Sequence, residues 1–518
     1  MNTDLAFGWR PIEQDFSTGL DPLGLASPIE RILDAETSGI TNATTRARYF
    51  SIIPWYYWRY TQLKGKADAR NQRQFAKGFE MLLAYANIAW LEQKQISRTG
   101  IIRRVYCQRT WNARHKSLPL RGPRISDSPS PLDAALYGPS LRRLNLLGRY
   151  SQLVTCREAG EIMAKEVDKA LRPLTGYKEL VSAKSVDAST IRKWAAQLSL
   201  DLPKKREAEL LRALLFSYGK FAQDDTPPRV YSMMLMLSVG LTTRKSFTPN
   251  SIEIAIASGK TLGGKAYIPE PLLNATYRRW RILALLKNLR HASELALAAV
   301  HAFVGDHPER FANAENAALH LISETFNDDT SGVPLKYRDL LLKYEAEEHS
   351  PSWHPSEDTP TVMLGHALKI CAWCHAILRS ESGQLLLEEK AAHVGDVLNA
   401  DLSGYYDQLE SLLEADGDVA LKWICVDRAI ARHFHVASRK LAMHDTFRLI
   451  EDEHGVSASS TCPIADIAIR VEAMLSLIAD IKLIQRTEGG FQVLPETRTW
   501  YREQLARVEE SLQSSDPY

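Results

Sequence analysis

The residues of this chain best suited to binding chemistry are arginines, which crowd its first third. Between residues 41 and 150, twenty lysines and arginines stand against five aspartates and glutamates. Arginine outnumbers lysine there, and its planar guanidinium binds phosphate through two parallel hydrogen bonds. This excess predicts a nucleic-acid surface; the alternatives are a solvated basic face or an interface with the chain's own acidic regions. The arginines that we expect to bind nucleic acid are Arg46, Arg48, Arg98, Arg103, Arg104, Arg109, Arg114, Arg121, Arg124, Arg142 and Arg143.

Aromatic side chains are densest in segment 39–60, which holds seven aromatic residues and three arginines. Rings beside guanidinium groups suit a stacked protein–protein contact, and they also suit contact with nucleic acid. The structural alternative is an aromatic plug that fixes this segment onto a helical body. The residues that we predict to form a protein interface are Tyr49, Phe50, Trp55, Tyr56 and Trp58.

A C-x-x-C-H sequence formed by Cys371, Cys374 and His375 is the one pattern here with metal-binding spacing. On a helix these positions share one face, and Cys425 or His366 would supply a fourth ligand. Core packing is the preferred interpretation, because a free cysteine packs as a small hydrophobe. The sequence lacks the motifs of a serine nucleophile, a zinc-binding helix and a phosphate-binding loop. We therefore predict no metal, no cofactor and no catalytic residue, which favours a protein that is not an enzyme.

The composition is that of an ordinary globular protein, with 518 residues of which 45% are apolar and 24% charged. The first residues carry neither the basic segment nor the apolar core of a secretory signal. The apolar runs fall short of the roughly 20 residues that a membrane span needs. Six cysteines in so long a chain favour reduced thiols over a disulfide framework. We expect a cytoplasmic protein without membrane contact.

Helical periodicity predicts a mainly α, multi-helical fold of two to three domains with minor β-hairpin elements. Segment 71–95 repeats apolar residues at spacings of three and four, which is typical of an amphipathic helix. Hairpins are expected near 246–271, where apolar and polar residues alternate, and near 481–495, around Gly489 and Gly490. The predicted regions are 1–150, with a proline-rich basic arm, 151–271, with a small β element, and 272–518, which ends in a hairpin and a helix.

Five short stretches carry a resemblance to a known family. They are Gly8–Trp9, the LGLASPIERILD of Leu23–Asp34, the GITN that begins at Gly39, the RARYF that begins at Arg46, and Pro54–Trp55. In these stretches the first 60 residues resemble an uncharacterised family of bacterial proteins from antiviral defence islands. Ser38 stands where the family has a proline. The resemblance implies a component that works beside nucleases or helicases, with Arg46, Arg48, Tyr49, Phe50 and Trp55 as signature positions and no catalytic residue. The partners that we expect are proteins of the nuclease, helicase or ATPase kind.

Three functional hypotheses follow. The first is a non-enzymatic subunit of a bacterial antiviral defence complex, which contacts nucleic acid through an arginine-rich face and scaffolds protein partners. The second is a stand-alone nucleic-acid-binding regulator that uses a winged-helix-like element at 481–512. The third is a metal-dependent enzyme built on Cys371, Cys374 and His375.

Overall fold

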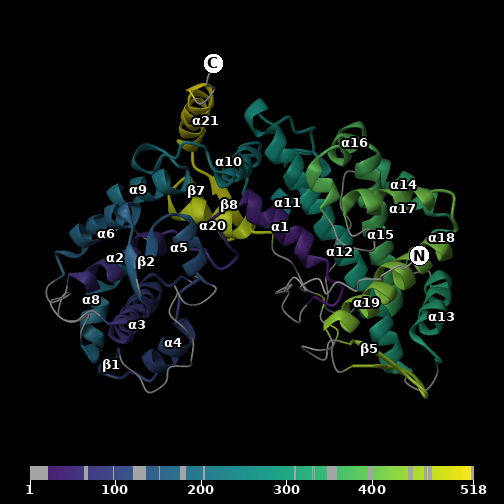
Figure 1. Cartoon of the computed structure of the whole chain (residues 1–518), viewed down its shortest axis with the longest axis horizontal. Coiled ribbons are helices and arrows are strands. Elements are labelled where there is room, and N and C mark those ends of the chain that lie inside the picture. The colour runs from purple at the N-terminus through teal and green to yellow at the C-terminus, as the bar shows by residue number, and fades with distance from the viewer. Residues whose placement is uncertain are drawn as a thin grey trace, which may run out of the picture. The chain divides into compact units, whose positions relative to one another are not determined.

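The computed structural model confirms a mainly α, multi-helical fold in which the strands form only small antiparallel pairs (Figure 1). All six cysteines lie in the described part of the chain, and none of them forms a disulfide. The residues that the structure describes are 21–62, 68–96, 99–120, 136–150, 152–174, 183–201, 203, 205–307, 311–328, 331, 333–346, 359–394, 401–440, 447–459, 462, 464 and 469–514.

The chain forms two compact units that alternate along the sequence. Unit 1 comprises Met1–Ile32, Ala257–Gly259 and Arg278–Ile467, and unit 2 comprises Leu33–Ile256, Lys260–Tyr277 and Ala468–Tyr518. The three consecutive regions that the sequence suggested therefore do not coincide with the units. In particular, the last 51 residues belong with the arginine-rich first third, in unit 2.

Unit 2 is a helical body whose long helix α3 (Ala69–Lys94) is buried along most of its length. Asp68 caps the start of α3, where its side chain accepts a hydrogen bond from the Asn71 amide at 2.8 Å. Apolar side chains then recur at helical spacing, as the sequence predicted, and α3 packs against α4 (Arg104–Asn112) and α8 (Ala188–Leu198). The other α-helices among the described residues of unit 2 are α2 (Tyr49–Thr61), α5 (Gly138–Arg143), α6 (Glu158–Leu171), α9 (Lys205–Leu215), α10 (Pro228–Gly240), α20 (Val471–Asp480) and α21 (Thr497–Ser514).

Four two-stranded antiparallel sheets accompany the described helices. The predicted hairpin near 481–495 is confirmed, with Ile484 opposite Val493 and a turn at Glu488 and Gly489. The strands are β1 (Ser117–Pro119) with β4 (Ser185–Asp187), β2 (Leu147–Tyr150) with β3 (Leu153–Cys156), β5 (Leu449–Asp452) with β6 (Gly455–Ala458), and β7 (Ile484–Thr487) with β8 (Gly490–Val493).

The predicted hairpin near 246–271 is wrong over most of its length, because α11 (Pro249–Ser258) occupies its first half. Thr248 and Ser251 cap this helix reciprocally, each backbone amide donating to the other's hydroxyl at 2.9 and 3.1 Å. Pro249 then fits the first helical position. Two isolated β-bridges remain of the expected strands, one between Lys260 and Ala266 and one between Phe247 and Phe491.

Unit 1 is also helical. Its helix α15 (Pro360–Arg379) is long and apolar enough to cross a membrane, but 67% of its apolar window is buried, as in the core helix of a soluble protein. A π-helical stretch at Trp423–Ile430 joins α18 (Gly417–Lys422) to α19 (Ala431–Lys440). The other α-helices that the structure describes wholly within unit 1 are α13 (Ala314–Asn327), α14 (Tyr337–Ala346), α16 (Glu381–Leu387) and α17 (Leu402–Ser411). Residues of both units occur in α1 (Ala26–Glu36), α11 and α12 (Asn274–Asp306).

Candidate nucleic-acid interface

Helix α4 is held at both ends by carboxylates of α3. At its start, Arg103 adopts a left-handed backbone with φ of 61°, and its Nε lies 2.7 Å from Oε2 of Glu80. Burial raises the pKa of Glu80 to about 7, against the opposing effect of Arg103. At its end, Trp111 donates from Nε1 to Oε2 of Glu92 at 3.1 Å. The two contacts fix one face of α4 against α3.

The remaining side of α4 and the segment after it are basic. Arg109 lies on the helix and is exposed, and Arg114, His115 and Lys116 follow it, all three exposed. A further basic side chain reaches this cluster from α8, where the Arg192 guanidinium lies 4.8 Å from the centre of the Trp111 ring. We use the name α4 surface for the side chains of Arg104, Arg109, Arg114, His115, Lys116 and Arg192.

Three cavities lined by described residues border the α4 surface. The first, of about 950 Å³, lies where the end of α4 and the segment after it meet the end of β4 and the start of α8. The second, of about 320 Å³, lies between α3 and α4 and shares Glu92, Trp111 and Asn112 with the first. The third, of about 730 Å³, lies at the start of α4, and Arg104 borders both it and the second. The basic side chains thus flank a row of concave surfaces.

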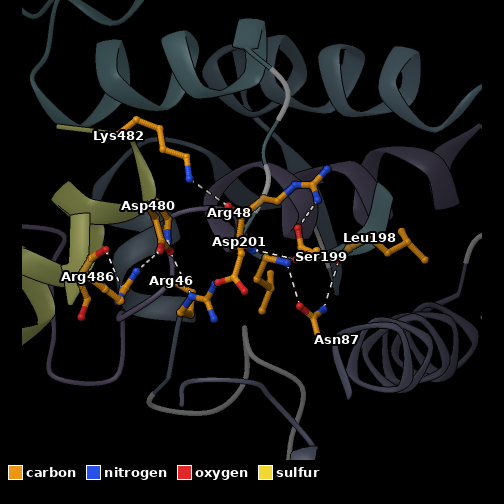
Figure 2. Close-up of polar contacts among 12 residues, drawn as sticks. Arg46, Arg48, Asn87, Leu198, Ser199, Asp201, Asp480, Lys482 and Arg486 are labelled. Atoms are coloured by element: carbon orange, nitrogen blue, oxygen red, sulfur yellow. Dashed lines mark hydrogen bonds and ion pairs between the residues drawn. The ribbon is translucent and has the colours of Figure 1, made fainter. Parts of the chain in front are cut away.

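Arg46, by contrast, lies in the core of unit 2 (Figure 2). Its guanidinium donates from Nε to Oδ2 of Asp480 at 3.1 Å and from Nη2 to Oδ1 of Asp201 at 2.5 Å. Burial disfavours its charge, but the two carboxylates outweigh burial and raise the pKa of Arg46. Asp480 also accepts a hydrogen bond from Arg486 at 2.7 Å, and Lys482 donates to the Asp201 carbonyl at 3.3 Å.

Arg48 is buried in the same way, two residues further on. Its Nε and Nη2 donate to the two carboxylate oxygens of Glu207 at 3.0 and 3.1 Å, and its Nη1 donates to the Ser199 carbonyl. The Ser51 hydroxyl donates to the same carboxylate at 2.6 Å. This bidentate pair leaves neither charge without a partner.

These positions correct part of the predicted nucleic-acid surface. Arg46 and Arg48 are core residues, because carboxylates from distant segments surround them, and Arg103 is held by Glu80. Arg109 and Arg114 are brought together with Arg104 at α4. Arg142 and Arg143 are exposed on α5, where Arg143 pairs with Asp34 at 3.3 Å. Arg98, Arg121 and Arg124, together with residues 121–135 of the proline-rich arm, lie outside the described residues.

The aromatic residues predicted as a protein interface are mainly core residues of unit 2. Tyr49, Phe50, Trp55 and Tyr56 are each at most 1% exposed, and only Trp58 is half-buried. The Tyr49 and Phe50 rings pack against Tyr137, and Trp55 packs against Phe79 with ring centres 4.9 Å apart. The structural alternative, an aromatic plug, therefore describes four of these five residues.

In unit 1, the histidine of the C-x-x-C-H helix is hydrogen-bonded through both of its ring nitrogens. Nε2 of His375 lies 2.9 Å from Oε1 of Glu410, and Nδ1 lies 3.1 Å from the Tyr337 hydroxyl. Burial lowers the pKa of His375, against the opposing effect of Glu410, and burial raises the pKa of Cys371 to about 12. Throughout the described part of the chain, no three side chains of metal-binding type lie close enough to hold an ion. Both ring nitrogens of His375 already have partners, so the helix does not support the metal hypothesis.

The residue of the α4 surface that sequence reasoning missed is Arg192. It lies 78 residues beyond Arg114, on helix α8. A helical pattern identifies a buried face, but it does not say which neighbouring element lies beside the exposed one. No protein-family model, no curated protein and no solved structure matches this chain.

Proposed function

We propose that unit 2 binds nucleic acid through the α4 surface, by contact with backbone phosphates. The observation that supports this most is the exposure of Arg109, Arg114 and Lys116 beside a row of cavities, while the buried face of α4 is pinned by Glu80 and Glu92. Cations on a fixed scaffold gain more from phosphate contact than mobile ones, because less side-chain and backbone freedom is given up on binding.

The wider role that we propose is that of a non-enzymatic, cytoplasmic subunit of a bacterial antiviral defence complex. The resemblance of the first 60 residues supports this role, and the described part of the chain offers no metal cluster that would favour the enzyme hypothesis. Protein partners of the nuclease, helicase or ATPase kind would supply the chemistry. Purification of the tagged protein from its host, with and without nuclease treatment, would test this: defined partners that survive nuclease support a complex, and a lone protein contradicts it.

The regulator hypothesis finds less support. The β7–β8 hairpin and α21 are present, but the outer edge of β8 is already paired, since Phe247 and Phe491 exchange two backbone hydrogen bonds of 2.8 Å. On β7, Arg486 is held by Asp480. A wing needs a free tip with basic side chains for the nucleic-acid backbone, and these two contacts tie the hairpin to the body of unit 2.

Charge reversal on the α4 surface tests the binding proposal. The double variant Arg109→Glu, Arg114→Glu should weaken binding to oligonucleotides of every sequence, because phosphate contacts carry no sequence information. The slope of log K against log salt should shrink by roughly one unit for each phosphate that the variant no longer neutralises. Fluorescence anisotropy across a salt series measures both. Arg103 and Arg46 are unsuitable for this test, because each is buried in an ion pair.

The matched control is Arg206→Glu, which reverses an exposed charge on α9 in the same unit. We expect it to change the affinity only slightly. A salt slope that is the same in the wild type, the double variant and the control would contradict the proposed phosphate contacts.

A further inference from the structure

The cavity of about 950 Å³ at the end of α4 has a composition that the general basic surface does not explain. We call it the Trp111 cavity. Arg114, His115, Lys116 and Arg192 line it, and all four side chains are exposed to solvent there. The phosphates of a nucleic-acid strand are spaced along its backbone, so side chains that contact only successive phosphates would be spread out along the strand. Here four basic groups converge on one hollow.

Two carboxylates also line the Trp111 cavity and offset part of this charge, but its lysine and arginine side chains outnumber them by one. Glu92 is engaged by the Trp111 indole, and Asp187 is the one other carboxylate among the lining residues. Asp187 precedes α8 but makes no capping hydrogen bond with its side chain in the described structure. The backbone amides at the start of α8, beside Ser189, carry partial positive charge of their own.

The wall of the cavity offers a second kind of contact. The Arg192 guanidinium lies 4.8 Å from the centre of the Trp111 ring, and both residues line the cavity. Trp111 itself is buried, but the Arg192 guanidinium that packs over it is exposed, and guanidinium planes stack on nucleobases of any identity. The volume lies within the range of pockets that take small ligands, and it accommodates a nucleotide with its phosphate.

We propose that the Trp111 cavity binds the terminal phosphate monoester of a nucleic-acid strand, with the end nucleotide against Arg192. A phosphate monoester carries a charge of about −1.5 to −2 at neutral pH, more than the single charge of an internal phosphodiester, and it has three terminal oxygens. Converging cations match the terminal group better than the internal one. The inference rests on the proposed function, because the rest of the strand would follow the α4 surface past Arg104 and Arg109.

The test compares strands of one sequence that differ only in their ends. Four labelled probes are needed: a 5′-phosphorylated strand, a 3′-phosphorylated strand, a strand with hydroxyls at both ends, and a closed circle. Anisotropy titrations with the full-length protein should show about tenfold tighter binding of one phosphorylated strand than of the hydroxyl-ended strand, the difference expected for charge-assisted hydrogen bonds. A preference for the 5′ or the 3′ phosphate identifies the end that is bound.

Two variants separate the cavity from the surface. Lys116→Gln should reduce the ratio between phosphorylated and hydroxyl-ended strands to near one. Arg109→Gln should weaken binding of all four probes by similar factors and leave the ratio in place. Equal affinity of the wild type for phosphorylated and hydroxyl-ended strands would overturn the proposal. Failure to bind any probe, the circle included, would instead overturn the proposed nucleic-acid function of the α4 surface.

Discussion

Arg46 and Arg48 at the start of α2 and Arg109 and Arg114 at α4 belong to one basic stretch of sequence, yet the fold treats them in opposite ways. The first pair is 3% and 1% exposed and meets three carboxylates. The second pair is exposed beside cavities. Net charge along the sequence therefore says little about which arginines reach the surface.

The difference between the two regions lies in what surrounds them. The carboxylates of Asp201, Glu207 and Asp480 come from segments more than 150 residues away, and only the tertiary fold of unit 2 brings them to α2. A buried arginine without such partners would cost several kcal/mol, so these positions demand both charges together. At α4, solvent screens the charges, so an exposed arginine there does not need a carboxylate partner. Three substitutions, at Arg48, at Glu80 and at Arg109, sample the comparison from core to surface.

Removal of the Arg48 guanidinium should have the largest effect. Arg48→Met leaves the Glu207 carboxylate buried without its bidentate partner, which typically costs about 3–5 kcal/mol of unfolding free energy. Hydrogen exchange measured by mass spectrometry on peptides of α2 and α9 reports the stability of unit 2 by itself. We expect exchange in both helices to accelerate strongly.

The double variant Arg48→Met, Glu207→Leu gives the matched control, because it removes both charges. Replacement of a buried pair by apolar side chains is often neutral, so exchange in both helices should slow again, close to the wild-type rates. Arg206→Met, at an exposed position of α9, should leave exchange nearly unchanged. Equal protection in Arg48→Met and Arg206→Met would contradict the core role of Arg48.

Glu80 should show an intermediate effect that depends on pH. Burial raises its pKa to about 7 in the folded protein, above the value of 4.5 of the free side chain. Because the folded state binds this proton more tightly than the unfolded state, the stabilisation by protonated Glu80 is fully present below pH 4.5. It disappears as the pH rises through 7. A shift of one pKa unit corresponds to about 1.4 kcal/mol, so the shift from 4.5 to about 7 lowers the stability by at most about 3.5 kcal/mol.

Glu80→Gln tests this dependence, because glutamine does not ionise. Between pH 5 and pH 8, hydrogen exchange of α3 peptides should accelerate in the wild type beyond its intrinsic pH dependence, and less so in Glu80→Gln. The same pH change in both proteins would mean that Glu80 is ionised in the folded state throughout. Arg103 keeps an amide acceptor in the variant, which limits damage to the start of α4.

The fold class and the individual helices could be predicted from the sequence because their signals are local. The amphipathic spacing of α3 and the turn at Glu488 and Gly489 between β7 and β8 both depend on residues close together in the sequence. At α11 two local signals conflicted: the alternation of SIEIAIAS indicates a strand, while Thr248, Pro249 and Ser251 indicate a helix start. The capping residues prevailed, since reciprocal hydrogen bonds and a proline at the first position favour the helix.

The candidate site could be predicted only in part, because it depends on which segments meet. The sequence indicated a basic region around Arg109 and Arg114, and the structure places both at α4. It gave no sign that Arg192 would stack on Trp111, or that Asp480 would reach Arg46 across 434 residues. Ion pairs between distant segments leave no periodic trace, so neither the buried network nor the Trp111 cavity could be read before the fold was known.

The smallest effect on stability, and the sharpest contrast with Arg48, is expected at Arg109. Arg109→Gln removes an exposed charge that binds nothing needed by the core, so the unfolding free energy should change by no more than about 0.5 kcal/mol. Its affinity for nucleic acid should nevertheless fall, because glutamine does not neutralise a phosphate. Hydrogen exchange of α4 and anisotropy on the same preparation separate the two quantities. If exchange of α4 instead accelerates in Arg109→Gln, this arginine belongs with Arg48 as a structural residue. Position on α4 would then not distinguish a surface arginine from a core arginine.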